Sequence, residues 1–232
     1  MKPWELLGEA RTPDGSLMAL MRRDREHVIL ADGKPLMSSL MHGSEEALAA
    51  LACEDARGVP QPSVLVGGLG MGFTLRAALD ALPSDAAVFV SELLTAVVEW
   101  NRGPLAHLAG EPLKDRRVTV LPDDVAAVMK SNAGRFDAIV LDVDNGPSAF
   151  TESANAWLYT DHGLTSAKAA LKPGGVLAVW SAWDDRKFQQ RLRYNGFRVE
   201  VTRVRARLKK GGPRHTIFVG HLDGPAHARA PR

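Results

Sequence analysis

From residue 63 onward, short apolar runs alternate with longer segments whose apolar residues recur at helical spacing. Such runs are typical of strands buried on both faces, and helices between them are typical of a parallel sheet. The pattern predicts seven strands, at Ser63 to Val66, Ala87 to Val90, Arg117 to Leu121, Ala138 to Leu141, Val176 to Ser181, Arg198 to Val204 and Thr216 to Gly220.

Helices are expected between most of these strands. Apolar residues repeat at helical spacing from Leu75 to Leu82 and from Leu164 to Leu171. The Lys172-Pro173-Gly174-Gly175 stretch is expected to end the second helix, because proline cannot continue a helix and glycine allows the chain to reverse. A short polar stretch separates the last two strands, which predicts an antiparallel hairpin and hence a mixed seven-stranded sheet.

The amino-terminal part has a different pattern. Between Leu17 and Met37, short apolar runs are broken by charged residues and Asp-Gly turns, which predicts a small antiparallel β-ribbon. A helix is expected from Ser44 to Cys53, with the Ser44 hydroxyl capping free amides and two glutamates facing the positive helix end. We therefore divide the chain into a ribbon and helix (1–57), a larger α/β unit (58–222) and a frayed tail (223–232).

Composition narrows the class of protein. The chain has 232 residues, 45% of them hydrophobic, which suits one α/β domain with a small appendage and argues against overall disorder. With 29 basic and 27 acidic residues, the chain has no strong positive electrostatic field that would attract nucleic acid or anionic lipid. A small-molecule partner is therefore expected. One cysteine, no exported leader and no membrane-spanning run favour the cytoplasm, and no metal cluster is visible.

A glycine-rich loop follows the first strand of the larger unit, where the chain reads VLVGGLGMG from Val64 to Gly72. Glycines let the backbone approach a ligand closely, although ordinary tight turns use them too. The loop lacks the Gly-Lys-Ser/Thr of phosphate-binding loops, and its Gly-x-Gly-x-Gly spacing is tighter than that of dinucleotide loops. The spacing favours an adenosyl thioether, and the candidate cofactor-binding residues are Gly68, Leu69, Gly70 and Gly72.

Acidic residues follow the next three strands. Glu92 ends the second strand, where a carboxylate can accept both hydroxyl protons of a ribose; the alternative is a solvated loop acid. Further polar residues follow the third strand (Asp123, Asp124) and the fourth (Asp142, Asp144, Asn145). Because ligands of open parallel sheets sit at the carboxyl ends of the strands, these residues are expected to line a site. His42 and His215 have no evident partners, and a structural role is expected for both.

These motifs together resemble the spermidine synthase-like branch of the S-adenosylmethionine-dependent methyltransferase fold, from about Asp32 to Gly220. The resemblance rests on the glycine loop, Glu92, the VLPDD stretch ending at Asp124, the FDAIVLD stretch ending at Asp142, and Leu171-Lys172-Pro173-Gly174-Gly175. It implies a Rossmann-like methyltransferase fold that binds S-adenosylmethionine or its decarboxylated form, without a metal, and it allows a homodimer through the amino-terminal ribbon.

The resemblance also implies roles for single residues. Glu92 would hold the ribose hydroxyls, and Asp124 or its neighbour Asp123 would hold the adenine amino group. Asp142 would take a proton from the attacking amine, although it can also be read as a loop acid that caps the following turn. Asp144 and Asn145 would contact the acceptor substrate.

The chain departs from the family pattern on the side of the amine. Where aminopropyltransferases have an aspartate in the glycine loop, this chain has Met71, and the second acid of their Asp-x-x-Asp signature falls on Asn145. Their Tyr-Gln-Glu or Tyr-His-Glu stretch aligns with Ser44-Glu45-Glu46, without the tyrosine. Burying a polyamine without paired carboxylates would be costly.

Three functions follow. The first is a transferase that moves an aminopropyl or related alkyl group to an amine acceptor. The alternatives are an S-adenosylmethionine-dependent methyltransferase acting on an amine or other nucleophile, and a non-catalytic nucleoside-binding or dimeric scaffold protein.

Overall fold

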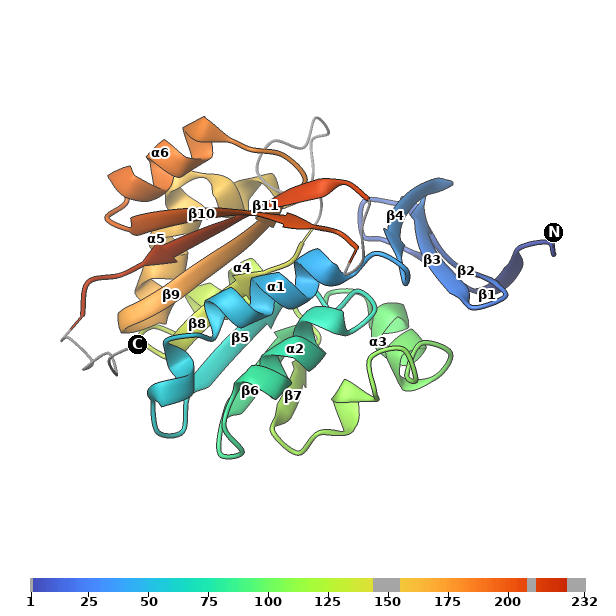
Figure 1. Ribbon diagram of the computed structural model, residues 1–232, viewed down its shortest axis with the longest axis horizontal. Helices are drawn as coiled ribbons and strands as arrows, with labels where there is room; N and C mark the ends of the chain where they lie inside the picture. Colours follow the sequence, from blue (N-terminus) through green and yellow to red (C-terminus); the bar gives the residue numbers. More distant parts are fainter. Residues whose placement is uncertain (1, 144–154, 208–211, 225–232) are drawn as a thin grey trace.

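The computed structural model describes residues 2–143, 155–207 and 212–224, which form two β-sheets and their covering helices (Figure 1). The smaller sheet is an antiparallel meander of four strands in sequence order. Its strands are β1 (Glu5–Arg11), β2 (Leu17–Arg23), β3 (Glu26–Ala31) and β4 (Lys34–Ser38). The predicted ribbon corresponds to β2, β3 and β4.

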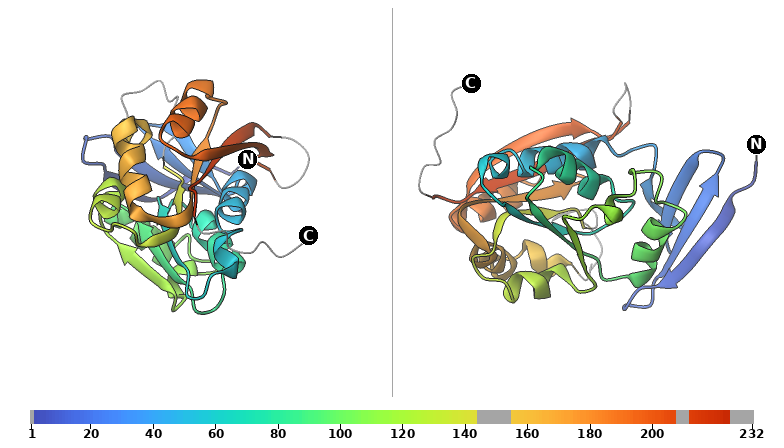
Figure 2. Two further views of the ribbon diagram at one scale, coloured as in Figure 1. Left: turned by 90° about the vertical axis from the view of Figure 1, so that its left-hand side faces the viewer. Right: turned by 90° about the horizontal axis from the view of Figure 1, so that it is seen from below.

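Strand β1 was not predicted, because its sequence is rich in charged residues and mostly exposed. It packs on the rest of the protein at Gly8, where an added Cβ would lie 2.5 Å from Nε1 of Trp100. The absence of a side chain at Gly8 thus lets the small sheet lie against the larger unit (Figure 2, right).

The larger sheet is mixed and has seven strands in the order β10-β11-β9-β8-β5-β6-β7. Its strands are β5 (Ser63–Gly67), β6 (Ala87–Ser91), β7 (Val118–Leu121), β8 (Phe136–Leu141), β9 (Leu171–Ser181), β10 (Arg198–Arg205) and β11 (Arg214–His221). Strands β5 to β9 run parallel, and β11 is antiparallel to both of its neighbours. All seven predicted strands and the mixed Rossmann-like sheet are confirmed.

Helices cover both faces of this sheet (Figures 1 and 2). They are α1 (Gly43–Ala52), α2 (Phe73–Ala81), α3 (Thr95–Arg102), α4 (Val125–Lys130), α5 (Asp161–Ala170) and α6 (Arg186–Tyr194). Because side chains alternate along a strand, Val64 and Val66 pack with α1 and α2, whereas Leu65 packs with α4, α5 and α6 on the opposite face. Among the described residues, none of the helices has the length and apolar character that crossing a bilayer would require.

Two local predictions were wrong. Ser44 does not cap α1, because the helix already begins at Gly43 and the hydroxyl, inside the first turn, donates to Oε2 of Glu45 at 2.6 Å. Leu171 does not belong to the preceding helix. That helix ends at Ala170, one residue earlier, and Leu171 is already the first residue of β9, paired with Phe136 of β8.

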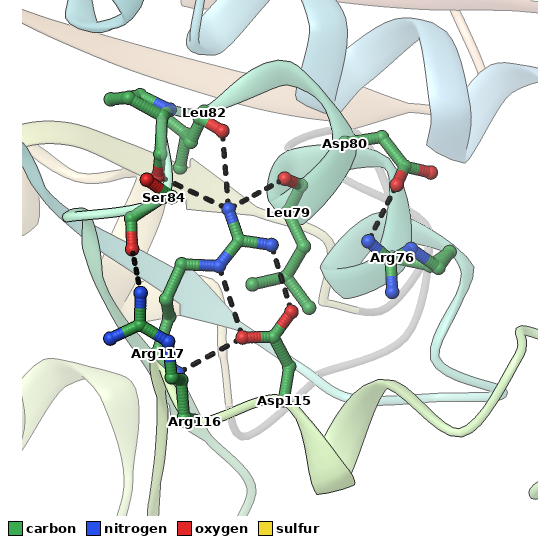
Figure 3. A network of polar contacts seen from close by, with 9 residues as sticks. Arg76, Leu79, Asp80, Leu82, Ser84, Asp115, Arg116 and Arg117 are labelled. Atoms are coloured by element: carbon green, nitrogen blue, oxygen red, sulfur yellow. Dashed lines mark hydrogen bonds and ion pairs between the residues drawn. The ribbon is translucent and has the colours of Figure 1, made fainter.

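Arg117 joins the end of α2 to the start of β7 (Figure 3). Its Nη1 donates to the carbonyl oxygens of Leu79 and Leu82 at 2.9 and 3.1 Å, and Nη2 donates to Asp115 at 2.8 Å. Hydrogen bonding to Arg117 lowers the pKa of Asp115 to about 2. The guanidinium satisfies carbonyls that the helix end leaves without partners, and it thereby fixes α2, whose other end adjoins the glycine loop.

Candidate active site

The glycine loop connects β5 to α2 at the carboxyl end of the parallel strands. Gly68, Gly70 and Gly72 have φ angles of +89°, +50° and +83°, in the left-handed region that favours glycine. A Cβ on Gly68 would lie 2.4 Å from the carbonyl oxygen of Asp142. The loop backbone therefore lies directly against the segment that follows β8, and a side chain at this position would separate the two.

Two neighbouring elements support the loop from outside. Asn101 of α3 donates through Nδ2 to the carbonyl oxygen of Gly70 at 2.8 Å and to that of Val97 at 2.9 Å. On the other side, Met37 of β4 approaches Gly70, since an added Cβ there would lie 3.0 Å from its sulfur. The small sheet and α3 thus hold the loop in place.

Glu92 points toward the glycine loop. One carboxylate oxygen accepts the backbone N–H of Leu69 at 3.0 Å, and the other accepts that of Leu94 at 2.9 Å. Burial raises the pKa of Glu92, and these hydrogen bonds oppose the rise. A carboxylate has about four acceptor positions, so Glu92 can accept further hydrogen bonds besides those from Leu69 and Leu94.

Asp123 and Asp124 follow β7 on the same rim. Asp124 is the N-cap of α4, with Oδ1 accepting the N–H of Ala126 at 2.6 Å, whereas the Asp123 side chain is exposed and accepts the N–H of Asp124 at 2.8 Å. Ser91, at the end of β6, donates to the Asp123 carbonyl at 2.5 Å. The structure thus brings both acids to the rim and gives Asp124 a role in starting α4.

Asp142 follows β8 and lies beside the first turn of α2. Its Oδ2 accepts the Thr74 hydroxyl at 2.5 Å, and its backbone N–H donates to the carbonyl of Gly67 at 3.0 Å. Burial raises the pKa of Asp142 to about 6, against the smaller lowering effect of the Thr74 hydrogen bond. The predicted substrate residues Asp144 and Asn145 lie outside the described residues.

The structure adds a group that the sequence did not identify. Glu45, in the first turn of α1, is only 7% exposed, and burial followed by repulsion from Asp142 raises its pKa to about 8. The buried Ser44 hydroxyl lies 2.6 Å from Oε2 of Glu45 and 2.9 Å from Nδ1 of His215 in β11. The ring of His215 in turn lies edge-on to Trp180, with 4.5 Å between the ring centroids.

A weak signal for Glu45 was present in its alignment with a family motif. His215 had none, because 171 residues separate it from Ser44. Its expected structural role remains compatible with the contacts, but the Ser44 hydroxyl also connects it to Glu45. Within the described chain, no cluster of three or more metal-ligating side chains is present.

Two open depressions lie elsewhere on the surface. One of about 660 Å³ surrounds the Arg117 network, and one of about 580 Å³ lies between α1, α2 and the segment Leu108 to Gly110. Neither is lined by Glu92 or Asp142, the acids at the carboxyl ends of the strands. The acids at the carboxyl ends of the strands, and not a cavity, therefore locate the candidate site.

Comparison with known families agrees with this geometry. The family described as "Spermine/spermidine synthase domain" matches residues 41–191, a range that includes Glu45, the glycine loop, Glu92 and Asp142. The chain belongs to this family. His215 lies beyond the matched range, so its contact with Ser44 is not part of the segment that defines the spermine/spermidine synthase domain.

Curated relatives of the chain have two kinds of name. A putrescine N-methyltransferase 1 of Nicotiana tabacum is 35% identical over 125 residues, covering 52% of this chain and 31% of the relative. A polyamine aminopropyltransferase of Leptospira biflexa is 34% identical over 123 residues, covering 52% of this chain and 41% of the relative. The chain matches less than half the length of these relatives.

Solved structures show the same fold over nearly the whole chain. Spermidine synthase from Thermotoga maritima aligns with a TM-score of 0.70 at 18% identity, covering 93% of this chain and 72% of that protein. A probable spermidine synthase from Corynebacterium glutamicum aligns with a TM-score of 0.67 at 18% identity, covering 95% and 81%. At this level of identity the alignments establish only the architecture. The chemistry has to be argued from the side chains of this chain.

Proposed function

We propose that this protein is a transferase that binds S-adenosylmethionine or its decarboxylated form and moves an aminopropyl or related alkyl group to an amine. The observation that carries the proposal is the pair of acids on either side of the glycine loop. Glu92 is bonded to the loop at Leu69; the backbone carbonyl of Asp142 lies against the loop at Gly68, and its carboxylate accepts the hydroxyl of Thr74, just after the loop. We assign Glu92 to a sugar diol and Asp142 to the nucleophile.

The proposed chemistry requires little more than this arrangement. A carbon bonded to a sulfonium is already electrophilic, so the protein has to align the amine, remove its proton and exclude water. With its pKa raised to about 6, Asp142 is largely ionised near neutral pH and still basic enough to take a proton. Thr74, through its hydrogen bond, holds the Asp142 carboxyl in one orientation.

Methyl transfer is the second candidate. Met71, where aminopropyltransferases have an acid, is fully buried and provides no carboxylate for the free amine of a decarboxylated donor. The names of the curated relatives include both reactions, methyl transfer to putrescine and aminopropyl transfer. We place aminopropyl or related alkyl transfer first because the family and the fold are those of spermidine synthases.

A binding experiment followed by product analysis tests the proposal. Methylthioadenosine and S-adenosylhomocysteine, the thioether products of the two reactions, should raise the melting temperature of the protein, because each binds the folded state. Incubation with putrescine and either donor, followed by mass spectrometry, should then show whether an aminopropyl or a methyl group is transferred. If neither thioether shifts the melting temperature and neither product forms, the enzyme proposal is wrong and the scaffold alternative is favoured.

Two further parts of the proposal concern the setting of the enzyme. We propose a cytoplasmic location, supported by the single cysteine, Cys53, which is buried. We also propose a homodimer formed through the four-stranded sheet, which has exposed apolar side chains at Leu6 and Leu36. Light scattering at several protein concentrations tests the dimer, and a monomer mass at every concentration would contradict it.

A further inference from the structure

Glu45 and Asp142 form an unusual pair of acids within the site. The side chain of Glu45 comes from the start of α1, and that of Asp142 follows the end of β8. Glu45 is only 7% exposed and Asp142 is partly buried, and among the described residues neither has a lysine or arginine partner. Two neighbouring carboxylates that are shielded from water and lack a cation cannot both be charged at low cost, so one of them has to carry a proton or a cation has to bind.

The surroundings of Glu45 identify it as the acid that carries the proton. The charged groups on the elements packed around it have partners of their own, are acidic, or, like Arg205 of β10 and Arg214 of β11, are exposed to water. On α1, Glu46 is bonded to His42; on α2, Arg76 is paired with Asp80; on β10, Arg203 is paired with Asp184. Asp142, which follows β8, repels the charge of Glu45, and His215 of β11 is connected to Glu45 through the Ser44 hydroxyl. Glu45 is thus left with a negative neighbour, a hydroxyl and an imidazole.

The Ser44 hydroxyl provides a path for that proton. It lies 2.6 Å from Oε2 of Glu45 and 2.9 Å from Nδ1 of His215, and it has only one hydrogen to donate. When Glu45 is protonated, Glu45 donates to Ser44 and Ser44 donates to His215. When Glu45 is ionised, the order reverses, and His215 Nδ1–H donates to Ser44, which donates to Glu45.

We propose that Glu45 is the proton reservoir of the acceptor site: it is protonated while no cation is present, and it gives up its proton through Ser44 to His215 when a cationic amine binds beside Asp142. This inference rests on the proposed function. The O–H bond of Glu45 breaks as a new O–H bond forms at Ser44. The original Ser44 proton forms the Nδ1–H bond of His215, and the half-buried imidazolium then releases its Nε2 proton to water.

The consequence is that the net charge of the acceptor site depends on whether an amine is bound. Without an amine it carries one negative charge, on Asp142, and the second carboxyl is neutral. With a cationic amine bound, both carboxylates are ionised, so the second charge appears only when a cation is present to compensate it. In this way Glu45 replaces, from a different element, an acid that the family has and this chain lacks.

Infrared spectroscopy of the protein without ligand is the first test. At pH 7 a protonated carboxyl band should be present, should disappear in Glu45→Gln and should persist in the matched control Glu46→Gln, which changes the next residue of the same helix. A spectrum without this band, or a band that survives Glu45→Gln, would overturn the proposal.

Calorimetry with putrescine as the probe is the second test, in the presence of methylthioadenosine and in two buffers of different ionisation enthalpy. About one proton should be released per amine at pH 7, and none should be released from Glu45→Gln. In Ser44→Ala, the number of protons should be unchanged, but a pH-indicator dye in a stopped-flow experiment should report release that is about tenfold slower or more. Unchanged release kinetics in Ser44→Ala would overturn the path.

These outcomes separate the inference from the proposed function. If putrescine binds and the carboxyl band persists, the reservoir is wrong and the transferase proposal stands. If the band behaves as expected but neither thioether nor amine binds, the protonated Glu45 stands, and the proposed function and the release step that depends on it are both wrong.

Discussion

At the scale of single residues, Glu92 provides the sharpest test of nucleoside binding. Glu92→Ala should weaken the binding of methylthioadenosine by about 1 to 3 kcal/mol, because two charge-assisted hydrogen bonds to the ribose would be lost. Isothermal calorimetry measures the change. Since Glu92 also bonds to Leu69, Glu92→Gln is a useful companion, because its side-chain oxygen can still accept one N–H. Wild-type affinity in both variants would remove Glu92 from the ribose site.

Asp142 should affect transfer and not nucleoside binding. Asp142→Asn keeps the size of the side chain and an oxygen for the Thr74 hydroxyl, but it removes the base. We expect methylthioadenosine affinity close to that of the wild type and a rate of transfer at least about a hundredfold lower in single-turnover measurements. An unchanged rate would mean that another group accepts the amine proton.

The sequence alone predicted which acids lie at the strand ends, but it did not predict the side-chain contacts within the site. Glu92 and Asp142 could be predicted because each directly follows an apolar strand in a parallel sheet, which fixes the edge where they lie. The contact between Ser44 and His215 could not be predicted, because it depends on β11 being inserted between β9 and β10. No local pattern encodes that proximity.

At the scale of elements, the strands were more predictable than the helix ends. Buried strands have unbroken apolar runs, whereas the first residue of α1 depends on backbone angles that Ser44 does not determine. Strand β1 shows the same limit, since its residues pair with β2 while exposing charged side chains. Hydrogen bonds along the edge of a sheet do not require apolar side chains, so the hydrophobic pattern of the sequence does not reveal such a strand.

Arg117 allows the packing of α2 to be tested. Arg117→Ala should lower the free energy of unfolding by about 2 kcal/mol, because it removes the donor to the carbonyls of Leu79 and Leu82 and leaves Asp115 unpaired. Urea unfolding measures this. The control is Arg102→Ala, which breaks an exposed ion pair with Glu99 and should change stability by less than about 0.5 kcal/mol. Equal effects of the two variants would contradict a structural role for Arg117.

At the scale of the whole molecule, the buried acid pair should make stability depend on pH. The pKa of Glu45 rises from its ordinary value of 4.5 to about 8 on folding, so between these values the folded state holds a proton that the unfolded state has lost. Stability must then fall as pH rises, by up to about 1.4 kcal/mol per pH unit. Asp142, raised from 3.8 to about 6, contributes in the same direction at lower pH.

Urea unfolding at pH 6.5 and pH 8 tests this dependence. The window lies at and above the ordinary histidine pKa of 6.5, and burial lowers the pKa values of His27 and His215 further, so histidines contribute little to the change. We expect the wild type to lose about 1 to 2 kcal/mol over the window and Glu45→Gln to lose much less. Glu46→Gln should behave like the wild type. Stability that rises with pH would contradict the raised pKa of Glu45.

The position of β11 has a practical consequence for dividing the chain. The family match ends at residue 191, yet the antiparallel strand that covers the edge of β9 starts only at Arg214. A protein shortened to the matched segment would present β9, one of the most apolar strands, as a bare edge open to pairing with other molecules. Boundaries drawn from homology would therefore yield an aggregating fragment, whereas cutting after Leu222 would preserve the complete sheet.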